Sequence, residues 1–119
     1  MIEEIITKLQ KETKYRYYFD GTSKIEDCVV YKYRDAANDR ISQTFQLELH
    51  IIVKGIDTKA LRRIEQIKED INNCILTAPD RVLTKNIRQI RQNGGGQLTD
   101  ENTQTTHQIL YYDILYRKG

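Results

Sequence analysis

The chain has 119 residues, the usual size of one domain, and 30% of them are charged against 39% that are hydrophobic. Its 19 Lys and Arg and 17 Asp and Glu leave a net charge of +2, too small for the positive field that non-specific nucleic-acid binding needs. No apolar run approaches the roughly 20 residues of a membrane span, and residues 1–4 lack a signal peptide's basic and apolar regions. We therefore expect neither a membrane segment nor a cleaved leader.

The N-terminal residues 2–11 are predicted to form a short amphipathic helix. Four apolar side chains recur there at helical spacing, and charged side chains occupy the remaining face. These four are Ile2, Ile5, Ile6 and Leu9. The aromatic and polar residues 14–20 fit either a strand or an ordered loop, and residues 20–23 form a turn-forming cluster.

Two strands are predicted next. Residues 28–33 are rich in β-branched and aromatic side chains, and the polar residues 34–40 suit a hairpin connection. Residues 41–53 alternate between apolar and polar side chains, which predicts one long antiparallel strand with one solvent-facing side. Its apolar parity contains Ile41, Phe45, Leu47, Leu49, Ile51 and Val53.

A second amphipathic helix follows Gly55, with Asp57 as its expected N-cap. Its apolar residues recur at steps of three and four, the spacing of one helix face. They are Ala60, Ile64, Ile67, Ile71 and Cys74. Pro79 is expected to end the helical region, because the residue before a proline is pushed out of helical geometry.

The C-terminal third is less uniform. Residues 82–92 fit a helix or a strand, and we favour an edge strand with a possible bulge. The tract 93–104 contains Gly94, Gly95 and Gly96 and little apolar surface, so we expect a mobile hairpin loop. Residues 105–117 are apolar on both parities, which predicts a central strand covered on both faces, either by a helix and a neighbouring subunit or by a second layer.

Together these elements predict one α+β domain over residues 1–119. Its expected order is helix, strand, strand, helix, strand, strand, with one mainly antiparallel sheet of four or five strands packed against two helices.

Few residues suggest chemistry. His50 and His107 lack a neighbouring ligand at metal-binding spacing, and no serine has the setting of a nucleophile elbow. Cys28 and Cys74 are too few and too far apart for a metal cluster or disulfide framework, so we expect buried free thiols. We expect no catalytic site, no metal and no cofactor.

Two sets of residues are candidates for contacts with partners. Lys85, Arg88 and Arg91 form a potential basic edge, which either protects the sheet from unwanted pairing or binds a partner. The tyrosines, among them Tyr111 and Tyr112, could stack on bases, but the low net charge favours core packing and protein interfaces.

Residues 44–53, which lead through Gly55 into the second helix, and residues 106–116, which end the chain, resemble paired strands of the tail-terminator and minor capsid proteins of long-tailed bacteriophages. The likeness is one of element order and residue type, and it extends over nearly the whole chain. The glycine-rich tract departs from that pattern.

This resemblance implies a non-enzymatic virion protein, assembled in the host cytoplasm, that forms a ring of six copies at the head-proximal end of the tail. Such a ring stops polymerisation of the tail tube and offers a joining surface to the head, so the implied partners are other copies, the tube protein and the connector. A head-completion adaptor or a tail-completion protein is the alternative within the same class. A nucleic-acid-binding α+β module is a more distant one.

Overall fold

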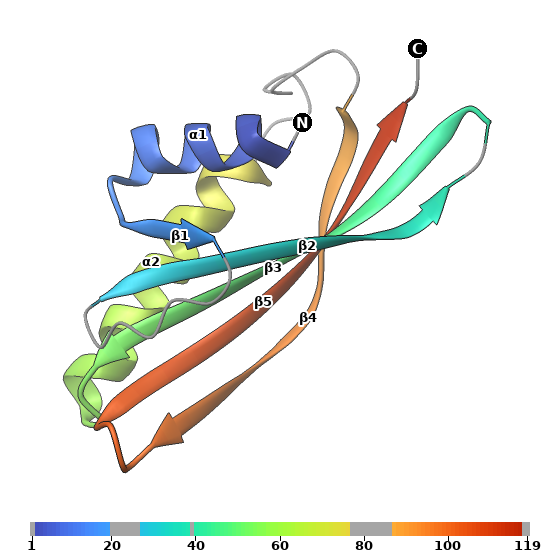
Figure 1. The fold of residues 1–119 in the computed structure, drawn as a ribbon. Helices are drawn as coiled ribbons and strands as arrows, with labels where there is room; N and C mark the ends of the chain where they lie inside the picture. The colour runs from blue at the N-terminus through green and yellow to red at the C-terminus, as the bar shows by residue number, and fades with distance from the viewer. Residues whose placement is uncertain (1, 20–26, 39, 77–86, 118–119) are drawn as a thin grey trace.

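The computed structural model describes residues 2–19, 27–38, 40–76 and 87–117, which form two helices and one five-stranded sheet (Figure 1). The elements in chain order are α1 (Ile2–Thr13), β1 (Tyr17–Phe19), β2 (Cys28–Asn38), β3 (Ser42–Lys54), α2 (Thr58–Ile75), β4 (Ile87–Asp100) and β5 (Thr105–Arg117). The strand order is β1-β2-β3-β5-β4, and only β1 and β2 run parallel. The predicted α+β class is confirmed, and the segment 14–20, which the sequence left open, contains the short strand β1.

Both helices pack against the same face of the sheet, where the main core lies (Figure 1). All nine side chains of the two predicted apolar stripes are buried there. The helix α2 begins where predicted, because the side chain of Asp57 accepts a hydrogen bond of 3.1 Å from the Ala60 backbone N–H. Neither helix has the length and apolar character that a transmembrane segment needs, within the part of the chain that the structure describes.

The long alternating strand is also confirmed, and it explains how the sheet divides its side chains between two faces. Leu47 lies opposite Tyr112, and Leu49 lies opposite Leu110, with all four side chains fully buried against the helices. Residues of the other parity, such as Glu48 opposite Tyr111, point away from the helices. We call this second side the open face, since no described helix or strand covers it.

The two faces of β5 are covered unequally. The strand is central, as predicted, because it pairs with β3 on one side and β4 on the other. Its apolar residues on the open face, including Ile109 and Leu115, are only half-buried. Among the described residues the helices cover one face only. Cover of the open face by a neighbouring subunit stays a prediction.

The hairpin between β2 and β3 is longer than predicted. The polar residues from Arg34 to Asn38 were expected to form a connection, but they continue β2, with a register irregularity between Asp35 and Ala37. This end of the hairpin extends past the helices, so both of its faces are exposed to solvent (Figure 1). Polar side chains can therefore belong to a strand there. Polarity alone did not mark the turn.

The strand β4 is a bulged edge strand, as expected for residues 87–92, while residues 82–86 and Pro79 lie outside the described residues. The loop predicted for residues 93–104 is wrong, because Gly94, Gly95 and Gly96 belong to β4 and the turn is formed by residues 101–104. A register shift between Gln92 and Gly95 forms a bulge, which glycine allows by adopting positive φ values. The glycines therefore bend a strand instead of ending it.

Candidate assembly surface

The two tyrosines proposed as interface residues have opposite positions, because successive side chains of β5 point to opposite faces. Tyr111 is half-buried on the open face, where another molecule can reach it. Tyr112 is completely buried, and its hydroxyl donates a 2.5 Å hydrogen bond to Oδ1 of Asn72 in α2. Tyr112 is thus a core residue, which is one of the two roles expected for the tyrosines, and its side chain is not accessible to a neighbouring subunit.

The basic edge is formed by the first half of β4. Arg88 and Arg91 are both exposed on this strand, and Lys85 lies outside the described residues. Because β4 is the last strand of the sheet, it pairs only with β5. Its outer backbone groups can therefore pair with another chain, although charged side chains at such an edge also discourage unwanted pairing.

Charged and polar side chains meet across β2 and β3 on the open face. Nζ of Lys32 lies 3.7 Å from Oε2 of Glu48, and Nε of Arg34 donates a 2.9 Å hydrogen bond to Oε1 of Gln46. Next to these pairs is a depression of about 400 Å³, which we call the basic depression. It is lined by Lys32, Tyr33, Arg34, Gln46, Glu48 and Tyr111.

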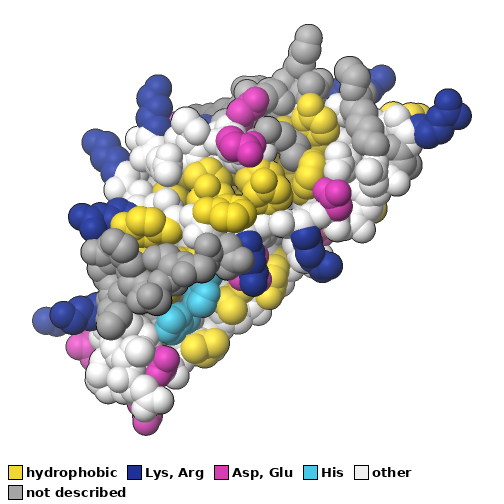
Figure 2. Space-filling view, in the orientation of Figure 1, with side chains coloured by type: hydrophobic (Ala, Val, Ile, Leu, Met, Phe, Trp, Pro, Cys, Tyr) yellow, Lys and Arg dark blue, Asp and Glu magenta, His cyan; other side chains and the backbone are white. Residues whose placement is uncertain are grey.

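The two histidines form a pair on the same face, which the sequence did not reveal because 57 residues separate them. Nε2 of His50 and Nδ1 of His107 lie 2.8 Å apart, and Nε2 of His107 lies 2.7 Å from Oγ1 of Thr105. Burial lowers the pKa of both histidines, and the positive charge that His107 would carry lowers the pKa of His50 further. Figure 2 shows the pair (cyan) among hydrophobic and basic side chains on the face turned to the viewer.

The pairing register explains this contact. Ile52 lies opposite His107, and His50 lies opposite Ile109, so the two histidines occupy diagonal positions on adjacent strands. Their shared face would have been a usable signal if the register of β3 and β5 had been known. No group of three or more His, Cys, Asp or Glu side chains suited to a metal ion occurs among the described residues.

The turn between β4 and β5 presents a second charged group at one end of the sheet. Oδ1 of Asp100 accepts hydrogen bonds from the backbone N–H groups of Asn102, at 2.9 Å, and Thr103, at 3.4 Å. Nε2 of Gln104 donates to the carbonyl of Glu101 at 2.8 Å, while the carbonyl of Gln104 accepts from the Gly55 N–H at 2.6 Å. These bonds fix an exposed acidic turn, which the sequence had suggested was part of a longer loop.

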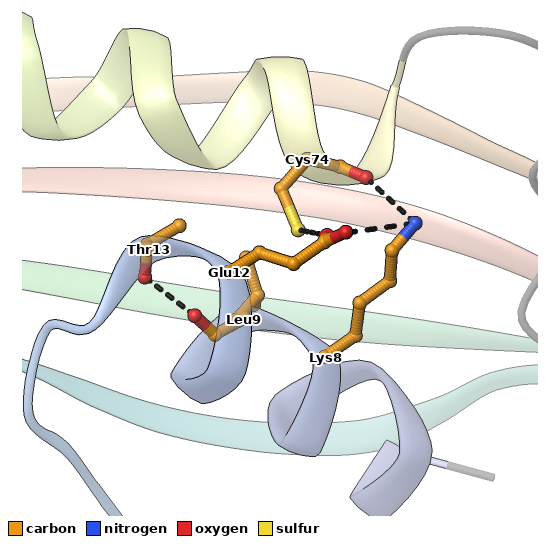
Figure 3. Close-up of polar contacts among 5 residues, drawn as sticks. All are labelled: Lys8, Leu9, Glu12, Thr13 and Cys74. Atoms are coloured by element: carbon orange, nitrogen blue, oxygen red, sulfur yellow. Dashed lines mark hydrogen bonds and ion pairs between the residues drawn. The ribbon is translucent and has the colours of Figure 1, made fainter.

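On the opposite side of the sheet, polar contacts fasten α1 to α2 (Figure 3). Sγ of Cys74 donates a 2.9 Å hydrogen bond to Oε2 of Glu12, and Nζ of Lys8 donates one of 3.2 Å to the Cys74 carbonyl. Burial and the Glu12 carboxylate raise the pKa of Cys74 to about 12, so the thiol stays protonated at neutral pH. Cys28 and Cys74 are both free and buried, as predicted.

No protein-family model matches this sequence, and no curated protein matches it. The fold does match a solved structure. A chain in the structure described as "Virion of native gene transfer agent (GTA) particle" superimposes with a TM-score of 0.67. The match covers 96% of this chain and 92% of that one at 8% sequence identity. The two chains therefore share their fold from end to end.

Proposed function

We propose that this protein is a structural component of a virion, and that it acts as a tail-terminator subunit. In this role, copies form a ring at the head-proximal end of a phage tail, stop the growth of the tail tube and provide the surface that joins it to the head. The role is structural and uses no catalytic residue.

The fold match carries the proposal. A chain within a gene transfer agent virion has the same arrangement over 96% of this chain and 92% of its own length. Fold alone does not define function. The resemblance of residues 44–53 and 106–116 to tail-terminator strands, in element order and residue type, supports the same class of protein.

The surface of the molecule also favours assembly. The open face carries half-buried apolar side chains, and Leu98 on β4 is 50% exposed beside them. The edge of β4 adds a row of backbone groups that no other described strand pairs with. A subunit of a larger structure would bury such surfaces against its neighbours.

The test is to add the purified protein to its tail-tube protein during polymerisation and to view the products by negative-stain electron microscopy. We expect shorter tubes, each with one capped end, and a cap that gold-labelled protein occupies. Tubes of unchanged length without label at either end would contradict the terminator role. A parallel sample contains isolated portal rings in place of tubes. Gold label on these rings, together with unlabelled tubes, would identify a head-completion adaptor instead.

A further inference from the structure

We infer that the acidic β4–β5 turn of one copy, residues 100–104, binds in the basic depression of a second copy. The inference rests on the proposed self-assembly and names the surfaces that would make its subunit contact. It follows from the charges, the positions and the rigidity of these two features of the same chain.

The basic depression suits a carboxylate. It presents the cationic groups of Lys32 and Arg34, and Glu48 offsets one of the two charges, so the site keeps a net positive charge. The Lys32 side chain is 53% exposed despite its pair with Glu48, which leaves its ammonium group accessible to a second carboxylate. The neighbouring hydroxyl and ring of Tyr111 complete a surface on which a short polar turn can pack.

The acidic turn suits this depression. Asp100 and Glu101 are adjacent, Glu101 is exposed, and the turn stands at the end of the hairpin (Figure 1). The hydrogen bonds around Asp100 and Gln104 already hold the turn in one conformation. Binding therefore costs little ordering entropy, which favours affinity.

The two features of one chain cannot meet each other. Thr105, at the turn, pairs with Lys54, whereas Tyr111, at the depression, pairs with Glu48 six residues further along the strand. At about 3.4 Å per residue, this separation is roughly 20 Å. The contact must join two copies. When each copy binds the next one, the contact is head-to-tail and closes into a ring if the rotation permits, whereas two copies that exchange the contact reciprocally would stop at a dimer.

Zero-length carbodiimide coupling, which joins an amine directly to a carboxylate, tests the contact. A mixture of ¹⁴N- and ¹⁵N-labelled protein is coupled and digested, and the cross-linked peptides are identified by mass spectrometry. We expect a mixed-isotope link between Lys32 and Glu101. The link between Lys32 and Glu48 within one chain, whose charged atoms are 3.7 Å apart, serves as the internal positive control.

Charge-reversal variants provide a second readout by sedimentation. Glu101→Lys and Lys32→Glu should each weaken self-association at least about tenfold, and the double variant should recover most of it, because the Lys32–Glu101 pair is restored with its signs exchanged. Glu69→Lys, which changes an exposed carboxylate on α2 in the same way, is the matched control and should leave association unchanged.

The outcomes separate the inference from the proposed function. One outcome is that oligomers form without the Lys32–Glu101 link and persist in both single variants. That result would overturn this contact and leave the proposed ring in place. A protein that stays monomeric alone and at tube ends would overturn both. Loss of association in the single variants without recovery in the double variant would also reject the pairing.

Discussion

At Gly95 the backbone of β4 passes so close to β5 that a side chain does not fit. A Cβ atom at this position would lie 2.2 Å from the carbonyl oxygen of Ile109, and the φ of +152° is one that L-residues rarely adopt. Three glycines in a row favour a loop when only the sequence is considered. The need for glycine arises from a strand that is distant in sequence, so local reasoning could not identify it.

The variant Gly95→Ala is expected to destabilise the fold. The steric clash and the unfavourable backbone conformation should together lower the free energy of unfolding by about 1–3 kcal/mol in urea denaturation. Gly96→Ala is the control, because a Cβ at Gly96 meets nothing within 4 Å. Equal stability of the two variants would show that β4 does not approach β5 in this way.

The histidine pair makes the stability of the fold depend on pH. His50 and His107 both have a pKa below the ordinary value of 6.5, so the folded protein binds fewer protons than the unfolded chain just below that pH. Stability should then fall as the pH decreases from 6.5 toward the folded pKa values, and it should be fully present above 6.5. Glu48 and Asp100 oppose the shifts, whereas Lys32 reinforces that of His50.

We therefore expect the wild type to lose more stability than a His50→Gln/His107→Gln variant when urea unfolding at pH 7.5 is compared with pH 5.5. The comparison cancels the contribution that carboxylate titration makes to the pH dependence, because both proteins have the same carboxylates. An NMR titration of the imidazole protons checks the cause directly. Folded-state values at or above 6.5 for both rings would disprove this explanation.

At the scale of elements, the sequence predicted the helices best. The apolar stripes of the two helices and the N-cap at Asp57 depend on residues that are close in sequence. The structure contains both stripes and the N-cap. Strand β3 was equally clear because a regular alternation over a long strand sets both the element and its buried face. The end of β2 and the whole of β4 were less clear, since their polar and glycine residues have strand geometry imposed by pairing partners.

In β5, successive side chains lie on opposite faces of the sheet, which separates two neighbouring tyrosines. The sequence singled out Tyr111 and Tyr112 together, and the register separates them into an open-face residue and a core residue. Tyr112→Ala should cost about 3–5 kcal/mol in unfolding free energy, because it leaves a cavity beneath α2 and removes the partner of Asn72.

The neighbouring variant Tyr111→Ala should keep nearly wild-type stability while it weakens association between copies. Thermal unfolding measures the first property, and sedimentation measures the second. If Tyr111→Ala unfolds the protein, or if Tyr112→Ala leaves its stability unchanged, the assignment of the two faces is incorrect.

At the scale of the whole molecule, the order of elements was largely readable from the sequence, and the unequal cover of the two sheet faces was not. The apolar residues on both parities of β5 are compatible with a second layer of the same chain or with a neighbouring molecule. Among the described residues, only one face has a layer of helices. The histidine pair, the basic depression and the exposed Leu98 all lie on the other face, where assembly would bury them.

The solution mass of the purified protein distinguishes a ring of subunits from a monomer. We would measure it by light scattering across a concentration series, alone and with the tail-tube protein present. The proposed ring would appear as one discrete species close to six times the 14.1 kDa of a single chain, either free or formed on the tube. A monomer at every concentration, which also fails to bind the tube protein, would contradict it.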